Sequence, residues 1–234
     1  QKHAVATIVL RPDPLVTQFG IIKIDDQNRV RQFLEYSHEE CSRKETKLRE
    51  LMFTGVQIVE TEFLESIPDG EYKDLSRDIY LQMMKNNLPI YGYVMEGYWT
   101  DIGTPLRYFQ ANMDCLSGRL NPLFSPSQAE LRQGSKKNKS AILLPPVAFG
   151  QNYSIGEKCI IGPLVSIGDA AILGNDLKIE KSIIWENTCI GDGAQISNSI
   201  VMSNVEIPAK AILDRVIVSK HKTSSLDLIQ APIK

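Results

Sequence analysis

The first half of the chain alternates apolar, β-branched runs with amphipathic segments. The run "AVATIVL" predicts a buried strand, and "FGIIKIDDQNRVRQFLE" predicts a strand, an Asp-rich turn and a second strand in which apolar and polar positions alternate. Strands interleaved with helices are typical of an α/β domain. Strands are predicted within 4–10, 19–35, 51–60 and 88–99, and helices at 61–68, 75–87 and 104–118.

The predicted helices have residues of the expected type at their ends. Thr61, Ser76 and Thr104 stand where an N-cap is expected, and Pro105 occupies the first helical position after Thr104. Gly118 is expected to end the last helix, because glycine adopts the left-handed conformation that often follows a helix.

Two polar stretches interrupt this pattern. Residues 36–50 are almost wholly polar and are expected to form an exposed loop or a short helix. Residues 119–141 are dominated by Pro, Ser, Gln, Lys and Asn and show no period, which indicates a domain boundary. We therefore expect a first domain at 1–118 and a linker at 119–144.

A six-residue period follows the linker. Blocks such as "IGEKCI", "IGPLVS" and "IGDAAI" open with an aliphatic residue, Gly often follows it, and the period slips to five at Ile184 and Val201. Such a period is typical of a parallel β-helix, in which three short faces close a turn of about 18 residues. The sequence predicts a β-helix over 145–220, with roughly four turns in 149–218, and a tail at 221–234. The residues expected to point inward are Ile155, Ile161, Ile167, Leu173, Ile179, Ile190, Ile196, Ile207 and Leu213.

The composition argues against two classes of partner. The net charge is −2, and the basic cluster "SKKNKS" contains no aromatic residue, so nucleic acid and an acidic membrane are not expected as partners. The chain contains no run of 18 apolar residues, so no membrane span is predicted. It begins with Gln1 and runs directly into an apolar strand, and we expect further residues upstream.

The cysteines indicate a reducing compartment. Cys41, Cys115, Cys159 and Cys189 form no C-x-x-C pair and no cluster with His at zinc-ligand spacing. Isolated thiols in a chain of this size fit the cytosol, so a cytoplasmic protein is predicted.

The stretch "EGYWTDIGTP" places a carboxylate, Asp101, between a predicted strand and a predicted helix. Ligand-binding residues of α/β proteins lie at such strand ends. An Asp can also cap a turn through its own backbone, and the stretch by itself favours this second interpretation.

The order of these parts resembles the sugar-nucleotide pyrophosphorylases, or sugar-1-phosphate nucleotidyltransferases. The resemblance runs from about Ala6 to Lys220 and rests on "ATIVLRPDP", "FGIIKIDDQNRVRQFLE", "FTGVQI", "GYWTDIGTPLRYFQAN" and the hexapeptides around "SIIWENTCIGDGAQI". It implies part of an α/β nucleotidyltransferase domain with a Rossmann-like mixed sheet, followed by a left-handed parallel β-helix. The Gly-rich "G-x-G-T-R-L" loop and the metal-binding "GD" pair of the family do not occur in these 234 residues.

The resemblance assigns roles to individual residues. Asp101 matches a metal-binding Asp, which favours the metal interpretation over the cap. Glu35 matches a Glu that contacts sugar hydroxyls, and the "FTG" residues Thr54 and Gly55 match a sugar-binding segment where a Cβ would block the approach of the sugar. Arg77 resembles an Arg that meets the sugar phosphate, which its planar fork suits. The catalytic residues implied are Asp101 and Arg77.

One position departs from the family. Where a Lys usually follows the Glu, this chain has Tyr36, so a cation that would meet the sugar phosphate is absent. Either Arg77 takes its place, or sugar binding is weak, or the chain is a non-catalytic paralogue that binds a sugar nucleotide or a partner subunit.

The reaction implied by the resemblance needs little covalent chemistry from the protein. A sugar-1-phosphate oxygen attacks the α-phosphorus of a nucleoside triphosphate and pyrophosphate leaves, so the protein aligns the reactants and stabilises phosphoryl charge. Mg²⁺ is the implied cofactor, because it binds carboxylates together with phosphate oxygens. Mannose-1-phosphate and GTP are the favoured substrates. A hexapeptide acyltransferase is disfavoured, because residues 145–220 contain no His to act as a base.

The β-helix is expected to mediate assembly into a homo-oligomer. Apolar residues cluster where the period slips, beyond those needed for the interior, and contiguous exposed apolar surface usually marks a contact site. The residues expected to be exposed are Ile184, Trp185, Ile200, Val201, Val216 and Ile217.

Overall fold

The computed structural model describes residues 3–13, 20–37, 47–120 and 136–226. The chain forms two compact units that divide between Trp99 and Thr100. Helix α4 (Pro105–Leu116) therefore belongs to the second unit, whereas the sequence placed it in the first domain. Within the described ranges no helix is both long enough and apolar enough to cross a bilayer.

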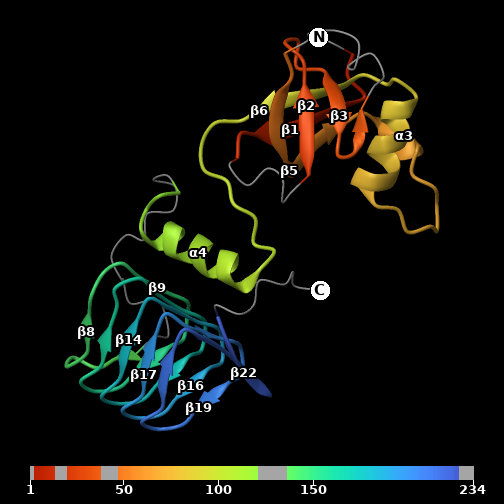
Figure 1. Ribbon diagram of the computed structural model, residues 1–234. Coiled ribbons are helices and arrows are strands. Elements are labelled where there is room, and N and C mark those ends of the chain that lie inside the picture. Colours follow the sequence, from red (N-terminus) through yellow and green to blue (C-terminus); the bar gives the residue numbers. More distant parts are fainter. Residues whose placement is uncertain (1–2, 14–19, 38–46, 121–135, 227–234) are drawn as a thin grey trace. The chain divides into compact units, whose positions relative to one another are not determined.

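The first unit is built on a mixed six-stranded sheet with strand order β4-β3-β2-β5-β1-β6 (Figure 1). Strands β1 and β6 run parallel, and the other neighbouring strands pair antiparallel. This sheet confirms the predicted α/β half. Its strands are β1 (Ala6–Arg11), β2 (Ile21–Ile24), β3 (Val30–Phe33), β4 (Tyr36–Ser37), β5 (Arg49–Val59) and β6 (Ile90–Val94).

The core of this unit lies between the sheet and helix α3 (Tyr80–Lys85). Alternate residues of β1 point into it, since Ile8 and Leu10 are fully buried. The Tyr80 ring stacks on Phe33 with centroids 4.8 Å apart, and its hydroxyl donates to Gln57 Oε1 at 2.6 Å. Burial raises the pKa of Tyr80. This polar anchor fixes the ring within an otherwise apolar layer.

Two of the three predicted N-caps are wrong. Helix α2 (Thr61–Glu65) has Glu60 at the N-cap, without a side-chain hydrogen bond. The second helix begins with a π-helical turn, η2 (Leu75–Ile79), whose N-cap is Asp74 rather than Ser76. Asp74 accepts from the backbone N–H groups of Ser76 and Arg77, which a carboxylate in this position does as readily as a hydroxyl.

The third predicted helix is confirmed at both ends. Thr104 Oγ1 accepts from the Arg107 N–H at the start of α4, and Pro105 takes the first helical position. At the other end Gly118 adopts a positive φ of 79°, and its N–H bonds to the Cys115 carbonyl. These ends fix the length and direction of α4, the element that follows Asp101.

The second unit contains a parallel β-helix with three faces, which confirms the predicted class (Figure 1). Strands on each face pair in parallel with the strands one turn before and after. The first face comprises β7 (Lys136–Lys137), β10 (Ser154–Ile155), β13 (Ile172–Leu173), β16 (Cys189–Ile190) and β19 (Glu206–Ile207). The second comprises β8 (Ile142–Leu143), β11 (Ile160–Ile161), β14 (Lys178–Glu180), β17 (Gln195–Ser197) and β20 (Ile212–Asp214). The third comprises β9 (Val147–Phe149), β12 (Val165–Ile167), β15 (Ser182–Ile184), β18 (Ile200–Val201) and β21 (Val216–Ser219), with β22 (Lys222–Ser225) antiparallel to β21.

The β-helix is longer than the sequence predicted. Each face carries five parallel strands, so there are five turns rather than four, and the first begins at Lys136, within the predicted linker. The inward positions are confirmed: eight of the nine expected residues are buried, and Leu213 packs partly against the same core. The slip in period is also seen, because Ile155 pairs with Leu173, 18 positions on, whereas Ile172 pairs with Cys189, 17 positions on.

The apolar residues near the slips are not an exposed surface, so that part of the prediction is wrong. Ile184 and Val201 point into the interior of the coil and are buried. Ile200 points outward but is also buried, and Trp185 and Ile217 pack beside it. Helix α4 covers this outer position of the third face. The chain therefore supplies its own cover for the residues expected to contact another copy.

Candidate functional site

A cavity in the first unit brings together two of the predicted site residues. Glu35 and Arg77 both line it, and so does Tyr36, the residue that replaces the expected Lys. The cavity lies between the β3–β4 hairpin and the start of η2. Its lining residues are Gly20, Ile21, Gln32, Phe33, Leu34, Glu35, Tyr36, Ser76, Arg77 and Leu81.

The β3–β4 turn presents Glu35 to this cavity. Leu34 takes a positive φ of 53°, and its N–H donates to the Ile21 carbonyl at 3.0 Å. The Gln32 side-chain amide donates to the Leu34 carbonyl at 2.8 Å, which fixes the turn from its other side. Gly20 has a φ of 89°, a conformation that residues with a side chain rarely adopt, and a Cβ there would also require the end of the Leu34 side chain to move.

The η2 turn presents Arg77 from the opposite wall. Its backbone is held by Asp74, while its side chain extends outward and is exposed. Arg77 also lines a second cavity, which contains the cations Lys73 and Lys85 and one carboxylate, Asp78. Among the described residues, neither the Arg77 guanidinium nor the Glu35 carboxylate has a side-chain hydrogen bond or an ion pair. Both groups are available to a ligand: a cation suited to phosphate faces the cavity together with an acceptor suited to hydroxyl groups.

Thr54 and Gly55 do not line this cavity. Backbone structure accounts for the residue type at both positions. The Thr54 hydroxyl is buried and donates to the Val9 carbonyl at 2.8 Å, next to a register shift between β1 and β5. Gly55 has a φ of 82°, which requires glycine, but a Cβ there would meet nothing within 4 Å. Crowding by the protein therefore does not explain this glycine, and sugar binding by these two residues stays a prediction.

Asp101 lies in the second unit, just before α4. Both of its carboxylate oxygens lie 2.9 Å from Arg107 Nη1, and Oδ2 also accepts from the Gly103 N–H at 3.2 Å. The Asp101 and Arg107 side chains are 29% and 30% exposed, so solvent still reaches the pair. Asp101 therefore does stabilise its own turn, and the same carboxylate is bound to a cation that the sequence interpretation missed.

The described residues do not by themselves form a Mg²⁺ site. No group of three His, Cys, Asp or Glu side chains in these ranges could hold a metal ion. Asp101 contributes a single carboxylate that already contacts Arg107. A Mg²⁺ ion at Asp101 would need its remaining ligands from substrate phosphates or from other carboxylates. The metal role of Asp101 stays a prediction.

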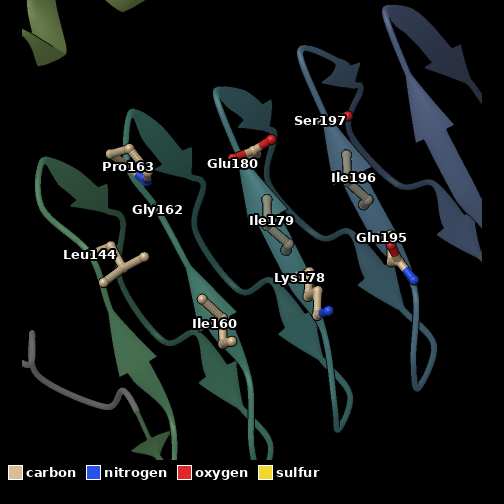
Figure 2. Close-up of a pocket in the computed structure, with 10 residues that line it drawn as sticks. All are labelled: Leu144, Ile160, Gly162, Pro163, Lys178, Ile179, Glu180, Gln195, Ile196 and Ser197. Atoms are coloured by element: carbon tan, nitrogen blue, oxygen red, sulfur yellow. The ribbon is translucent and has the colours of Figure 1, made fainter.

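A third pocket lies on the outer surface of the second face of the β-helix (Figure 2). Its centre is strand β14, where Lys178 and Glu180 flank the inward Ile179. Ile160 and Gln195 lie beside Lys178 on the neighbouring strands. The pocket contains one cation and one carboxylate on the same strand, and no His, Cys or further carboxylate that would suggest catalysis.

Sequence reasoning missed Arg107 and Asp74, which hold the segments carrying Asp101 and Arg77. Asp74 stands three positions before Arg77 at the start of a predicted helix, which is where a capping carboxylate is expected. Arg107 is the third residue of its helix and lies in the first turn, next to Asp101. No spacing rule predicts an ion pair between a residue before a helix and a residue in its first turn.

Two family models match the chain. One, described as "Nucleotidyl transferase", matches residues 1–118, and the other, described as "GMPPB C-terminal domain", matches residues 143–224. The first therefore includes Glu35, Arg77 and Asp101, and the second includes most of the β-helix.

Curated relatives cover the same region. A UTP–glucose-1-phosphate uridylyltransferase from Synechocystis sp. (strain PCC 6803) is 28% identical over 86% of this chain and 53% of its own length. Glucose-1-phosphate adenylyltransferases from Clostridioides difficile (strain 630) and Aliivibrio fischeri (strain MJ11) are 25% and 29% identical, over 88% and 94% of this chain and 50% and 56% of their own lengths. The chain thus spans about half the length of the curated relatives it matches.

Proposed function

The chain belongs to the nucleotidyl transferase family, and from that premise we propose that it is part of a sugar-1-phosphate nucleotidyltransferase. Such an enzyme forms an NDP-sugar and pyrophosphate from a nucleoside triphosphate and a sugar-1-phosphate. The observation that carries the proposal is the cavity shared by Glu35 and Arg77. It combines an acceptor for sugar hydroxyls with a cation for phosphate, in the part of the chain that the family model matches.

In this proposal Arg77 binds the phosphate of the sugar-1-phosphate and Glu35 accepts hydrogen bonds from the sugar hydroxyls. The turn that Gln32 holds places Glu35, and the Asp74 cap places Arg77, so neither segment has to be ordered when the substrate binds. Tyr36 cannot supply the charge of the usual Lys, which leaves phosphate binding to Arg77. Mg²⁺, when bound, would neutralise phosphoryl charge, and Asp101 is its predicted ligand.

Mannose-1-phosphate with GTP is our preferred substrate pair within this class. The relatives named above are transferases for glucose-1-phosphate, so both sugars belong in the test. Calorimetry of the 234-residue chain should detect a sugar-1-phosphate and give no signal with the free sugar. Pyrophosphate release by the protein expressed from its complete reading frame should then identify the base. Absence of both binding and turnover for every sugar-1-phosphate would refute the proposal.

A non-catalytic paralogue is the second candidate, and two observations favour it. Tyr36 replaces a cation, and Arg107 occupies the carboxylate predicted to bind metal. Such a protein would bind a sugar nucleotide or a partner subunit without turnover. Sugar-1-phosphate or sugar-nucleotide binding in the absence of pyrophosphate release would select this candidate.

We also retain the proposal that the β-helix mediates a homo-oligomer, but through its second face. Ile142, Ile160 and Ile212 are 55%, 37% and 76% exposed on the outer side of this face. In such a dimer, a two-fold axis lying along the face and perpendicular to the strands would place Lys178 opposite Glu180 of the partner subunit, and the same ion pair would form twice. Cytoplasmic location stays a prediction.

A further inference from the structure

Helix α4 packs on the outside of the β-helix through one apolar side. Leu106, Phe109 and Met113 follow the spacing of a single helix face and contact the outward Ile183 and Ile200 of the third face. Ile183 and Ile200 are each only 3% exposed, and the register places Ile200 beside Ile183 on the adjacent strand. Together with Leu226, which belongs to the same cluster, α4 therefore removes these side chains from water as thoroughly as a domain core would.

A polar contact fixes the orientation of α4 on this face. Trp185 Nε1 donates to the Tyr108 hydroxyl at 3.1 Å, and the two rings meet edge to face with centroids 5.9 Å apart. An apolar contact alone leaves a helix free to slide, whereas a hydrogen bond between two ring systems defines a single register. Helix α4 is thus held in one place along the coil.

The same helix holds Asp101. Arg107, in the first turn of α4, donates to both Asp101 oxygens, and Tyr108, the next residue, bonds to Trp185. Asp101 is therefore connected to the β-helix through two side-chain contacts made by adjacent residues. The boundary of the compact units agrees, because the second unit begins at Thr100 and includes the Asp101 turn.

We propose that the β-helix positions the Asp101 carboxylate through α4, with Arg107 as the positioning residue that links them. This inference deepens the proposed function, because it makes the β-helix part of the machinery that sets the geometry of a predicted site residue. The β-helix then serves more than assembly: a change in the packing of its third face changes where Asp101 lies.

Hydrogen exchange tests the link without any substrate. The Gly103 N–H donates to Asp101 Oδ2 and so reports the Asp101 turn. Ile200→Ala, on the β-helix and remote in sequence, should speed exchange in the peptides covering 100–107 at least tenfold. Ile172→Ala is the matched control, because Ile172 lies on the first face of the same β-helix, away from the proposed interface, and is 55% exposed. It should leave these peptides unchanged.

Three results would overturn the inference. Exchange at 100–107 could stay the same in Ile200→Ala, it could rise equally in Ile172→Ala, or strand β14 could lose protection together with the Asp101 turn, which would indicate general destabilisation. Tyr108→Phe is a milder second variant that removes only the acceptor of Trp185 Nε1. It should raise exchange at 100–107 by a smaller factor. If exchange rises in neither Tyr108→Phe nor Ile200→Ala, the proposed connection between the β-helix and Asp101 is refuted.

The role of Arg107 is tested by rescue. Nη1 of Arg107 meets both oxygens, and the ammonium of Arg107→Lys can supply a cationic donor in its place, whereas Arg107→Ala cannot. The NMR shift of the Asp101 side-chain carboxyl should move in Arg107→Ala and return towards the wild-type value in Arg107→Lys. Equal shifts in both variants would show that the helix start, not the charge, sets the carboxylate.

The activity of the complete protein separates this inference from the proposed function. Ile200→Ala should lower kcat while the KM for sugar-1-phosphate stays within twofold, because Glu35 and Arg77 lie in the other unit. Parallel changes in kcat and KM would contradict positioning of Asp101. If the wild-type protein shows no turnover, the proposed function fails, and the exchange experiment still decides whether the β-helix holds Asp101.

Discussion

Asp25 closes the turn between β2 and β3, and its carboxylate accepts three hydrogen bonds. Oδ1 accepts from the N–H groups of Gln27 and Arg29, both at 2.9 Å, and Oδ2 accepts from Arg31 Nε at 2.7 Å. The residue is only 6% exposed. Burial raises the pKa of Asp25, but the bonds from Arg31, Arg29 and Gln27 together outweigh it and hold this pKa below its ordinary value.

The substitution Asp25→Asn measures this arrangement, because it keeps size and removes charge. The Asn oxygen can still accept from Gln27 and Arg29, but an amide NH₂ would face the Arg31 guanidinium, so one charge-assisted bond is lost and two donors meet. We expect the first unit to lose about 1.5–3 kcal/mol of unfolding free energy at pH 7, the scale of a hydrogen bond to a charged group. Since β3 leads to Glu35 and Tyr36, the same loss loosens one wall of the cavity.

The pH dependence gives the sign of the effect. The folded pKa of Asp25 is lowered, so its stabilisation is fully present above the unfolded pKa of about 3.9 and is lost as the pH falls through the folded value. The difference between wild type and Asp25→Asn should therefore be constant from pH 7 to about pH 5 and shrink below about pH 4.

Urea unfolding followed by Trp99 emission in a Trp185→Phe background is the assay, because Trp99 belongs to the first unit and Arg11 packs over its ring. Asp26→Asn is the matched control, since Asp26 is the exposed neighbour in the same turn and should change stability by less than about 0.5 kcal/mol. A difference that persists undiminished at pH 3, or an equal loss in Asp26→Asn, would refute the reasoning.

Three further predictions concern function. Arg77→Ala should weaken sugar-1-phosphate binding by about 1.5–3 kcal/mol in calorimetry, the scale of a charge-assisted bond, and leave nucleotide binding unchanged; equal losses would make Arg77 structural. Asp101→Asn should lower turnover about a hundredfold, equivalent to about 2.7 kcal/mol. The same substitution should cost less than about 1 kcal/mol of unfolding free energy, because the ion pair with Arg107 is partly exposed. Near-normal turnover would show that Asp101 only caps its turn. Lys178→Glu should dissociate the oligomer in light scattering, and Lys178→Glu combined with Glu180→Lys should restore it; a monomeric wild type contradicts the assembly.

The fold was predictable because two periods in the sequence differ sharply. Alternation of period two marked the strands of the first unit, and the hexapeptide period marked the β-helix, where buried Ile161 and Ile179 open successive turns. The first turn was missed because its strands begin at Lys136, in a stretch whose polar composition resembles a linker. The polar composition of this stretch reflects its exposed side chains. The turn itself is formed by backbone hydrogen bonding of its strands to β10 and β11, which composition does not reveal.

The candidate site was predictable only in part, for a different reason. Glu35 and Arg77 were selected by resemblance, and they line one cavity because the β3–β4 turn and η2 approach each other in the first unit. The Arg107 contact with Asp101 could not be inferred, since a guanidinium six positions away can extend to solvent equally well. Only the direction in which α4 leaves the turn, set by the Thr104 cap and Pro105, brings the two charges together.

The apolar residues near the slips in period were expected to be exposed, and the reason that they are buried is general. Two adjacent aliphatic residues in a strand point to opposite sides, so pairs such as Ile183–Ile184 and Ile200–Val201 require burial on both sides of the same sheet. One residue of each pair is buried in the interior of the β-helix. The other points outward and must be covered by a further element, which the hexapeptide period does not predict. Here the cover is α4, whose apolar side was visible in the sequence but had no assigned target. Because α4 already covers the outer isoleucines of the third face, the proposed contact with a second copy requires a different surface, and the second face offers exposed isoleucines for it.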